Sequence, residues 1–249
     1  FGTWQETGMY LNLALIVGSY EGLGYGESIG KLIATNGLDL PSKDSLMHCI
    51  LNDKDFWRRS AASDLLQTIE DFELDTGRLE ISHPFADSSV QSIAYKLGIP
   101  FTGHPMFGQD IIYTHKMSKG AAIGRTAERD FLRYVHSISR LEGGVYLSVG
   151  SSIMSPMIFE KALSMARNVA EQSRKNISDC LIVVVDIQPE SWDWNKGEPP
   201  MDNPAYYQRF MKTFSRMGCS VLYICADNRL FFSSLCQSLM RQDRAGEFL

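Results

Sequence analysis

One turn in the sequence combines the residue types that bind phosphate groups. Gly150, Ser151 and Ser152 follow the apolar run 145–149 and lie just before Pro156, which suits the first turn of a helix. Small residues between a strand and a helix allow backbone N–H groups to approach an anion. The turn therefore predicts a site for a small molecule that carries a phosphate, although a capped turn of this kind also forms without a ligand.

Acidic and amide side chains follow the next two apolar runs. Asp186 comes directly after the run 181–185, and Asp227 and Asn228 come after the run 220–225. A carboxylate at the end of such a strand can accept hydrogen bonds from ribose hydroxyls. For Asp186, contact with a cofactor and closure of the following loop are equal alternatives. For Asp227 and Asn228 the position favours capping of the last helix, with contact to a cofactor as the second role.

A second group of residues has side chains suited to proton transfer. His104, Asp110 and His115 lie within TGHPMFGQDIIYTH, the segment 102–115. Histidine exchanges protons near neutral pH, so these three residues are the predicted catalytic groups. If 110–114 forms a strand, His115 lies at its carboxyl end, where ligands bind in α/β sheets. The spacing matches no metal-binding motif, and we expect no metal site.

The glycine-punctuated segment GSYEGLGYGESIG, residues 18–30, contains Glu21 and Glu27. Its glycines permit tight turns and close helix packing. Because two carboxylates repel a phosphate, the charges favour binding of a substrate amine by Glu21 and Glu27. Packing between two helices is the alternative.

Three arginines, Arg125, Arg129 and Arg133, recur at a spacing of four residues beside Glu128 and Asp130. Mixed charges at this spacing are typical of a solvated helix face.

The predicted strands and helices alternate in the second part of the chain. We expect strands near 79–81, 99–102, 110–114, 145–149, 181–185 and 220–225. We expect helices near 88–97, 127–141, 156–172, 204–217 and 229–241, and earlier ones from Ser42 and over 53–72. This alternation predicts an α/β fold of Rossmann-like class, a mainly parallel sheet with helices on both faces. Residues 1–78 would form a helical subdomain and residues 79–249 the α/β domain.

Composition excludes several classes of function. The formal net charge is −5, so no basic excess favours nucleic acid. Apolar runs are shorter than the ~20 residues of a membrane span, which predicts no membrane association. The five cysteines show no C-x-x-C spacing, so we expect neither a disulfide framework nor a zinc site, and a cytoplasmic location.

The order of features between Ser89 and Asn168 resembles that of the deoxyhypusine synthase family. The segments that carry the resemblance are SVQSIAYKLGIPF, DIIYTH, ERDFLRYVHSISRL and GGVYLSVGSSIMSP, followed by a helix ending in ARN. The resemblance implies a Rossmann-like domain that binds NAD, with Gly150, Ser151 and Ser152 at the cofactor. The family's catalytic lysine is not found in residues 71–88, which implies a retained NAD pocket and a different, or lost, reaction.

The sequence thus favours an NAD- or nucleotide-binding enzyme whose reaction it does not identify. A sugar-phosphate isomerase or sensor with an SIS-like parallel sheet is one alternative, because a serine-rich turn also suits a single phosphate. The other alternative is a non-catalytic interaction protein. In each case we expect a homo-oligomer, for which the helical first third could provide an interface.

Overall fold

The structure is a computed structural model that describes residues 4–245. The chain divides into two compact units, residues 1–134 and 135–249. The predicted boundary after residue 78 lies inside the first unit. Several contacts cross that boundary, among them the pairing of strand 37–40 with strand 77–80 and the packing of the helix that starts at Tyr25 against the helix that starts at Val90.

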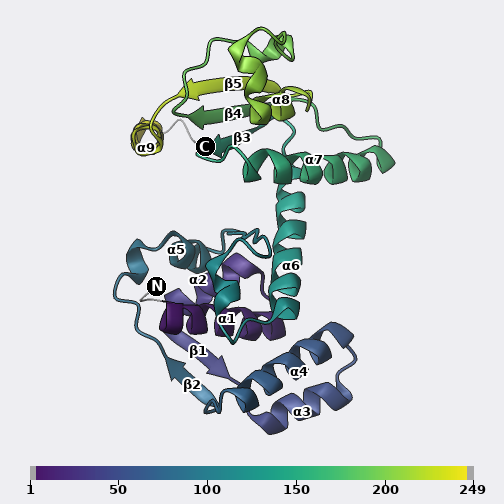
Figure 1. Ribbon diagram of the computed structural model, residues 1–249, viewed down its shortest axis with the longest axis vertical. Helices are drawn as coiled ribbons and strands as arrows, with labels where there is room; N and C mark the ends of the chain where they lie inside the picture. The colour runs from purple at the N-terminus through teal and green to yellow at the C-terminus, as the bar shows by residue number, and fades with distance from the viewer. Residues whose placement is uncertain (1–3, 246–249) are drawn as a thin grey trace. The chain divides into compact units, whose positions relative to one another are not determined.

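The first unit is mainly helical (Figure 1). Its elements are α1 (Trp4–Glu21), α2 (Tyr25–Thr35), β1 (Gly37–Leu40), α3 (Lys43–Asn52), α4 (Phe56–Asp71), β2 (Gly77–Glu80), η1 (Ala86–Ser88), α5 (Val90–Leu97), η2 (Ile111–Thr114) and α6 (Gly120–Ile138), of which the last four residues belong to the second unit. The strands β1 and β2 form an antiparallel pair. The helices α3 and α4 lie side by side.

The core of the first unit surrounds α1. Five successive residues of this helix, Leu13 to Val17, are at most 2% exposed. Burial on all sides is expected for a helix without a polar face, and α2 and α4 both pack against it. The predicted helices from Ser42, over 53–72 and over 88–97 are confirmed as α3, α4 and α5.

Side chains at the starts of these helices explain where they begin. Ser42, Asp55 and Ser89 each accept a hydrogen bond from a backbone N–H in the first turn of α3, α4 and α5, respectively. Such caps satisfy donors that have no partner within the helix.

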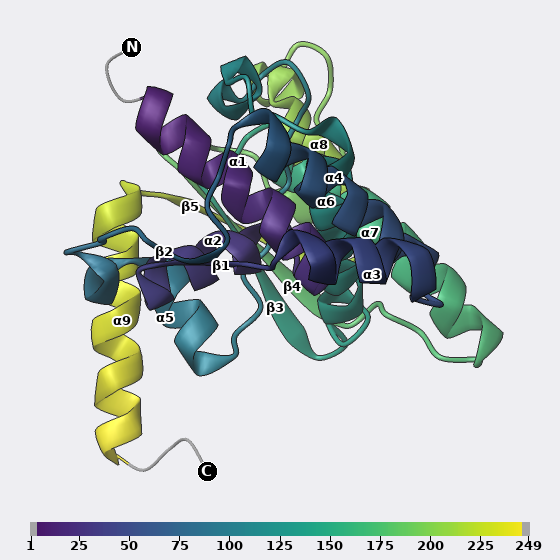
Figure 2. The ribbon, with the colours of Figure 1, turned by 90° about the horizontal axis from the view of Figure 1, so that it is seen from below.

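The second unit contains a three-stranded parallel sheet of order β3-β4-β5. Its elements are β3 (Gly144–Val149), α7 (Met154–Gln172), β4 (Cys180–Asp186), η3 (Trp194–Lys196), η4 (Pro204–Tyr207), α8 (Arg209–Ser215), β5 (Ser220–Cys225) and α9 (Asn228–Ala245). These confirm the last three predicted strands and the helices near them. The helix α9 begins where β5 ends and runs crosswise to it (Figures 1 and 2).

Aromatic packing covers one face of this sheet. Tyr146 of β3 stacks on Phe159 of α7 with ring centroids 4.0 Å apart, and Phe214 of α8 lies 6.2 Å from both rings. Side chains of β3 and β5 that point to the other face, Val145, Leu147 and Leu222, are 42–55% exposed. The structure therefore shows an α/β unit with a parallel sheet, one face of which is packed by α7 and α8.

Two predicted strands are wrong, and both lie in the first unit. Residues 99–102 have no regular structure, and residues 111–114 form the 3-10 helix η2. Pro100 lacks the N–H that a strand would donate, and the Thr114 hydroxyl donates to the Ile111 carbonyl, which closes the 3-10 turn. Short apolar runs do not distinguish strands from such turns.

The expectation that the chain lacks disulfides is also wrong. Cys180, at the start of β4, is bonded to Cys219, which directly precedes β5. The two residues are 39 positions apart in sequence. Because only the pairing of β4 with β5 brings them together, their spacing gives no signal.

Candidate functional site

The carboxyl ends of the three parallel strands bring together the predicted cofactor residues of the second unit. Gly150 follows β3, Asp186 ends β4, and Asp227 and Asn228 follow β5. Val149, Val185 and Ile224 are aligned across the sheet, so these polar residues lie along one edge. We call this set, Gly150 to Ser152 with Asp186, Asp227 and Asn228, the carboxyl-edge site.

The turn at Gly150 leaves no room for a larger side chain. The φ angle of Gly150 is +62°, in the region that favours glycine, and its N–H donates to the Val185 carbonyl at 3.1 Å. A Cβ atom at this position would lie 2.3 Å from the Asn228 side-chain nitrogen. The Asn228 amide therefore packs directly on the turn, and joins the end of β3 to the start of α9.

The two serines of the turn have different surroundings. The Ser151 hydroxyl accepts a hydrogen bond from the Ser155 N–H at 3.0 Å, which caps the start of α7. Ser152 is exposed. Within the described part of the chain, the backbone N–H groups of residues 151–154 donate no hydrogen bond. Four backbone donors without a partner among the described residues thus lie at the start of α7, at the positive end of its dipole and next to Gly150.

In each acid of the site, one carboxylate oxygen accepts hydrogen bonds from nearby backbone N–H groups. Asp186 Oδ1 accepts from the Gln188 N–H at 3.0 Å. Asp227 Oδ1 accepts from the N–H groups of Arg229 and Leu230, so the predicted capping of the last helix by Asp227 is confirmed. The second oxygen of each carboxylate has no hydrogen-bond partner among the described residues, and remains available to a donor.

Sequence reasoning missed Tyr223, which belongs to the same edge. Its hydroxyl donates to the Gln188 carbonyl at 2.8 Å. Burial, followed by the charges of Asp186, Cys225 and Glu190, raises the pKa of Tyr223 to about 12. The phenol therefore keeps its proton at neutral pH and acts as a donor. No sequence motif singles out this residue; its place follows from the pairing of β4 with β5.

The predicted catalytic residues belong to the first unit, in the loop between α5 and α6. Asp110 accepts a hydrogen bond from the Met106 N–H at 3.1 Å. Burial, with the charge of Asp110 next and then Tyr113, raises the pKa of Tyr25 to about 12. Asp110 thus lies near two tyrosines, Tyr113 of the same segment and Tyr25 of α2, and only Tyr25 was not expected from the sequence.

The two histidines have separate environments. His104 Nε2 lies 3.0 Å from the Thr102 hydroxyl, and burial lowers the pKa of His104. His115 Nδ1 accepts from the Met117 N–H at 3.1 Å, and burial, followed by the charge of Lys116, lowers the pKa of His115. Both imidazoles are therefore neutral at pH 7. Because η2 replaces the expected strand, His115 does not lie at a sheet edge.

The prediction that Asp130 belongs to a solvated helix face is wrong, because this carboxylate is buried and joins two of the segments quoted above. Asp130 of α6 is 0% exposed, and its Oδ2 accepts from the N–H groups of Gly26 at 2.8 Å and Gly103 at 2.7 Å. Its Oδ1 has no hydrogen-bond partner among residues 4–245. Burial raises the pKa of Asp130, against the lowering effect of the two N–H groups.

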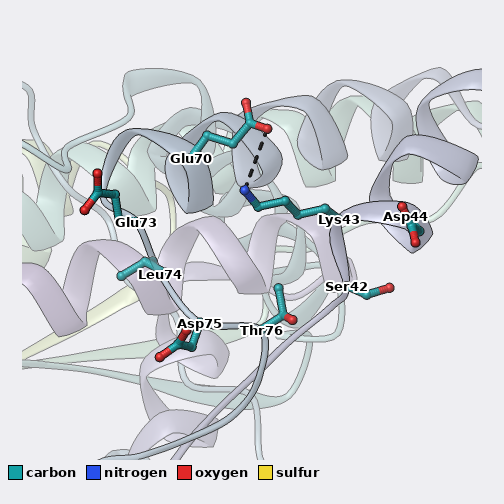
Figure 3. Close-up of a pocket in the computed structure, with 8 residues that line it drawn as sticks. All are labelled: Ser42, Lys43, Asp44, Glu70, Glu73, Leu74, Asp75 and Thr76. Carbon is teal, nitrogen blue, oxygen red and sulfur yellow. Dashed lines mark ion pairs between the residues drawn. The ribbon is translucent and has the colours of Figure 1, made fainter.

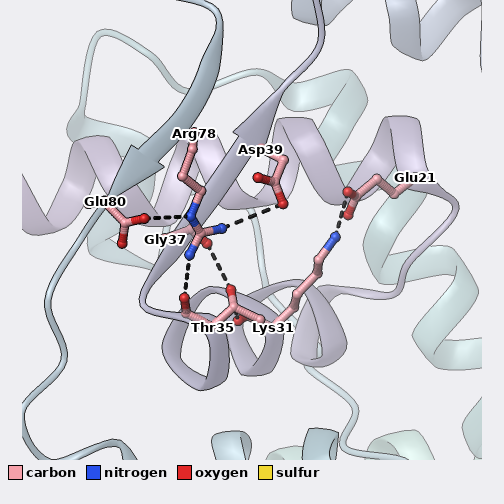
Figure 4. A network of polar contacts seen from close by, with 7 residues as sticks. All are labelled: Glu21, Lys31, Thr35, Gly37, Asp39, Arg78 and Glu80. Carbon is pink, nitrogen blue, oxygen red and sulfur yellow. Dashed lines mark hydrogen bonds and ion pairs between the residues drawn. The ribbon is translucent and has the colours of Figure 1, made fainter.

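The predicted amine-binding residues are engaged in ion pairs. Glu21 pairs with Lys31 at 2.5 Å, and Glu27 pairs with Arg133 at 2.5 Å. Figure 4 shows Lys31 reaching Glu21, beside the contacts of Arg78 with Asp39 and Glu80 that hold the β1–β2 pair. The role of Glu21 and Glu27 as substrate ligands stays a prediction, and it would require these pairs to open.

An open hollow of about 700 Å³ lies between the start of α3 and the end of α4 (Figure 3). Four carboxylates line it, and Lys43 pairs with one of them, Glu70, at 3.9 Å. No group of three or more potential ligands among the described residues could hold a metal ion.

None of the helices in residues 4–245 is long and apolar enough to cross a membrane. Comparison with protein-family models, with curated proteins and with solved structures gave no match to this chain.

Proposed function

We propose that the chain binds a nucleotide, with NAD as the first choice, at the carboxyl-edge site, in a Rossmann-like arrangement. The observation that carries the proposal is the convergence of three strand ends: the Gly150 turn with Asn228 packed on it, and Asp186 at the end of the neighbouring strand. In open parallel sheets ligands bind outside the carboxyl ends of the strands. The resemblance to the deoxyhypusine synthase family supports NAD as the ligand.

The residues of the site fit the parts of a dinucleotide. The N–H groups of residues 151–154 would donate to a phosphate, because helix N-termini favour negative charge. The second oxygen of Asp186 would accept from ribose hydroxyls. The Tyr223 hydroxyl lies near Asp186 and already donates its proton to the Gln188 carbonyl, so its oxygen would accept a hydrogen bond from the same sugar. Bound NAD would supply hydride transfer, while the reaction and substrate remain unassigned.

Calorimetric titration of the full chain with NAD tests the proposal. We expect Ser152→Glu to lower the affinity at least about tenfold, because the new carboxylate would lie where the phosphate binds. Ser152 is exposed, so the fold should persist. The matched control is Ser238→Glu, which adds the same charge at an exposed position of α9. Asp186→Asn, which keeps an acceptor for the Gln188 N–H, should weaken NAD binding as well.

The same titration distinguishes the alternative ligands. Hexose phosphates that bind while NAD does not would overturn the dinucleotide proposal in favour of a sugar-phosphate protein. If the Ser152→Glu and Ser238→Glu variants bind NAD with equal affinity, NAD does not bind at the carboxyl-edge site. If neither class of ligand binds, the nucleotide proposal fails.

A further inference from the structure

A pocket of about 300 Å³ lies in the first unit, between the start of α4 and one face of α6. Its lining residues are Asp55, Trp57, Arg125, Glu128, Arg129 and Leu132. The four residues from α6 recur at intervals of three, one and three positions, so they share one side of the helix. This volume is at the lower end of the range for small-molecule sites.

The two arginines of the pocket are bonded differently. Arg125 donates to the Ser19 hydroxyl at 2.9 Å and pairs with Asp64, so its charge is compensated. Arg129 donates through Nη1 to the carbonyls of Ser19 at 3.2 Å and Leu23 at 3.3 Å. Within the described residues Arg129 forms no ion pair, and its Nη2 and Nε donate no hydrogen bond. The predicted solvated stripe is thus partly a packed surface, in which Arg125 is ion-paired and Arg129 has no such pair among the described residues.

The surroundings of Arg129 disfavour its positive charge. Burial, and then the charge of Arg125, lower the pKa of Arg129, and Arg133 acts in the same direction. The guanidinium stays protonated because its ordinary pKa is so high. A bound anion would relieve this unfavourable environment.

Two carboxylates border the same pocket without pairing with Arg129. Against the lowering effect of burial, the charges of Asp55 and Glu128 act to raise the pKa of Arg129. Neither carboxylate lies within 4.0 Å of a cationic side chain among the described residues, so neither forms an ion pair. Asp55 Oδ1 caps α4 by accepting from the Trp57 N–H at 2.9 Å, and Glu128 has no hydrogen bond in the described part. The pocket therefore contains separated charges of both signs.

Large apolar side chains complete the pocket. Trp57 is 59% exposed and Leu132 is 52% exposed, although both belong to helices. Apolar surface of this size beside charged groups suits a ligand with an apolar body and a charged end.

We propose that this pocket binds a free amino acid with an apolar or aromatic side chain. Its carboxylate would accept hydrogen bonds from Arg129, and its ammonium group would lie between Glu128 and Asp55. The side chain would pack on Trp57 and Leu132. A ligand with only one charge would pair either with Arg129 or with the two carboxylates, and would leave the opposite charge of the pocket without a partner. The proposed ligand therefore carries both charges. The pocket is independent of the carboxyl-edge site.

Calorimetric titration of the full chain with L-phenylalanine and L-leucine tests this assignment. We expect binding of at least one of them, and at least about tenfold weaker binding of 3-phenylpropionate, which lacks the amine, and of phenethylamine, which lacks the carboxylate. Equal binding of L-phenylalanine and 3-phenylpropionate would contradict the requirement for an ammonium group. If neither amino acid binds, the proposed amino-acid site is wrong.

Two variants connect the ligand to the pocket. Arg129→Gln should abolish binding, but Arg129 also holds the end of α1, so loss of binding alone could reflect misfolding. Glu128→Gln changes an exposed side chain without hydrogen bonds, and should weaken binding of L-phenylalanine about tenfold while leaving that of 3-phenylpropionate unchanged. Glu73→Gln, an exposed position elsewhere in the first unit, is the matched control. A Glu128→Gln variant that binds L-phenylalanine as tightly as the control would contradict the proposal.

Discussion

At the scale of single residues, Asp130 is the side chain whose surroundings differ most from an ordinary acid. It is fully buried, and its two backbone donors serve one oxygen while the other has no partner in the described residues. It ties the first turn of α2 to the loop that contains His104. A carboxylate in this position is an anchor, because Asp130 lies 104 residues from Gly26 and 27 residues from Gly103 in sequence.

The raised pKa of Asp130 predicts the direction in which pH changes stability. Because the folded protein holds this proton more tightly than the unfolded chain, the stabilising contribution is complete below about pH 4 and is lost as pH rises through the raised pKa. We expect Asp130→Asn to abolish this dependence. Urea unfolding of both proteins between about pH 4 and pH 7 measures it.

The control for Asp130 is Asp71→Asn, which changes an exposed acid at the end of α4. The difference in unfolding free energy between the wild type and Asp130→Asn should fall as pH rises. A difference that is constant across this pH range would show that the carboxylate titrates normally.

At the scale of elements, the turn after β3 tolerates little change at Gly150. Gly150 and Gly143 both have positive φ angles, at +62° and +71°, but only Gly150 faces a side chain at contact distance. Gly150→Ala should therefore destabilise the second unit by about 1–3 kcal/mol, and Gly143→Ala by about 1 kcal/mol, from backbone strain alone.

A double variant separates the two causes at Gly150. Asn228→Ala removes the nitrogen that the new Cβ would meet, so Gly150→Ala should be less harmful in that background. Denaturant unfolding of the four proteins gives the coupling energy. Strictly additive effects would mean that the Asn228 amide does not pack on the turn.

The sequence predicts a helix or strand well where its hydrophobic pattern is compatible with one structure alone. The run 181–185 is apolar on both faces, as a central parallel strand requires, and β4 occupies it. Residues 110–114 also contain an apolar pair, at 111–112. There the Asp110 and Thr114 side chains bond to nearby backbone, which stabilises turns instead of a strand. Local hydrogen bonds of this kind leave no periodicity to detect.

The residues of the candidate sites also differ in whether a local sequence pattern reveals them. The residues of the carboxyl-edge site could be predicted because each directly follows an apolar run, and parallel strands end at one edge. Tyr223 and Asp130 could not, because their roles arise from contacts between distant segments. The pairing of Glu21 with Lys31 was missed for a related reason, since it depends on how α1 and α2 pack.

At the scale of the whole molecule, the division into two units predicts where a stability change is felt. The disulfide between Cys180 and Cys219 lies within the second unit, and it closes a loop of about 40 residues, which stabilises a fold by about 2–4 kcal/mol. The double variant Cys180→Ala, Cys219→Ala should lower the protection of β3, β4 and β5 in hydrogen exchange. The α1 core should keep its protection.

Thiol counting gives the control for this prediction. The denatured, unreduced protein should show three free thiols, from Cys49, Cys225 and Cys236. A count of five free thiols would show that Cys180 and Cys219 are not bonded. Equal loss of hydrogen-exchange protection in both units of the double variant would contradict the independent stability of the two units.

The disulfide lies at the amino ends of β4 and β5, whereas Asp186 and Asp227 follow the carboxyl ends of the same strands. The nucleotide that we propose at one end would favour the paired state of these strands, as the covalent bond does at the other end. By thermodynamic linkage each strengthens the other. Bound nucleotide would slow reduction of the disulfide by dithiothreitol, so the reduction rate reports occupancy of the site without any measure of catalysis.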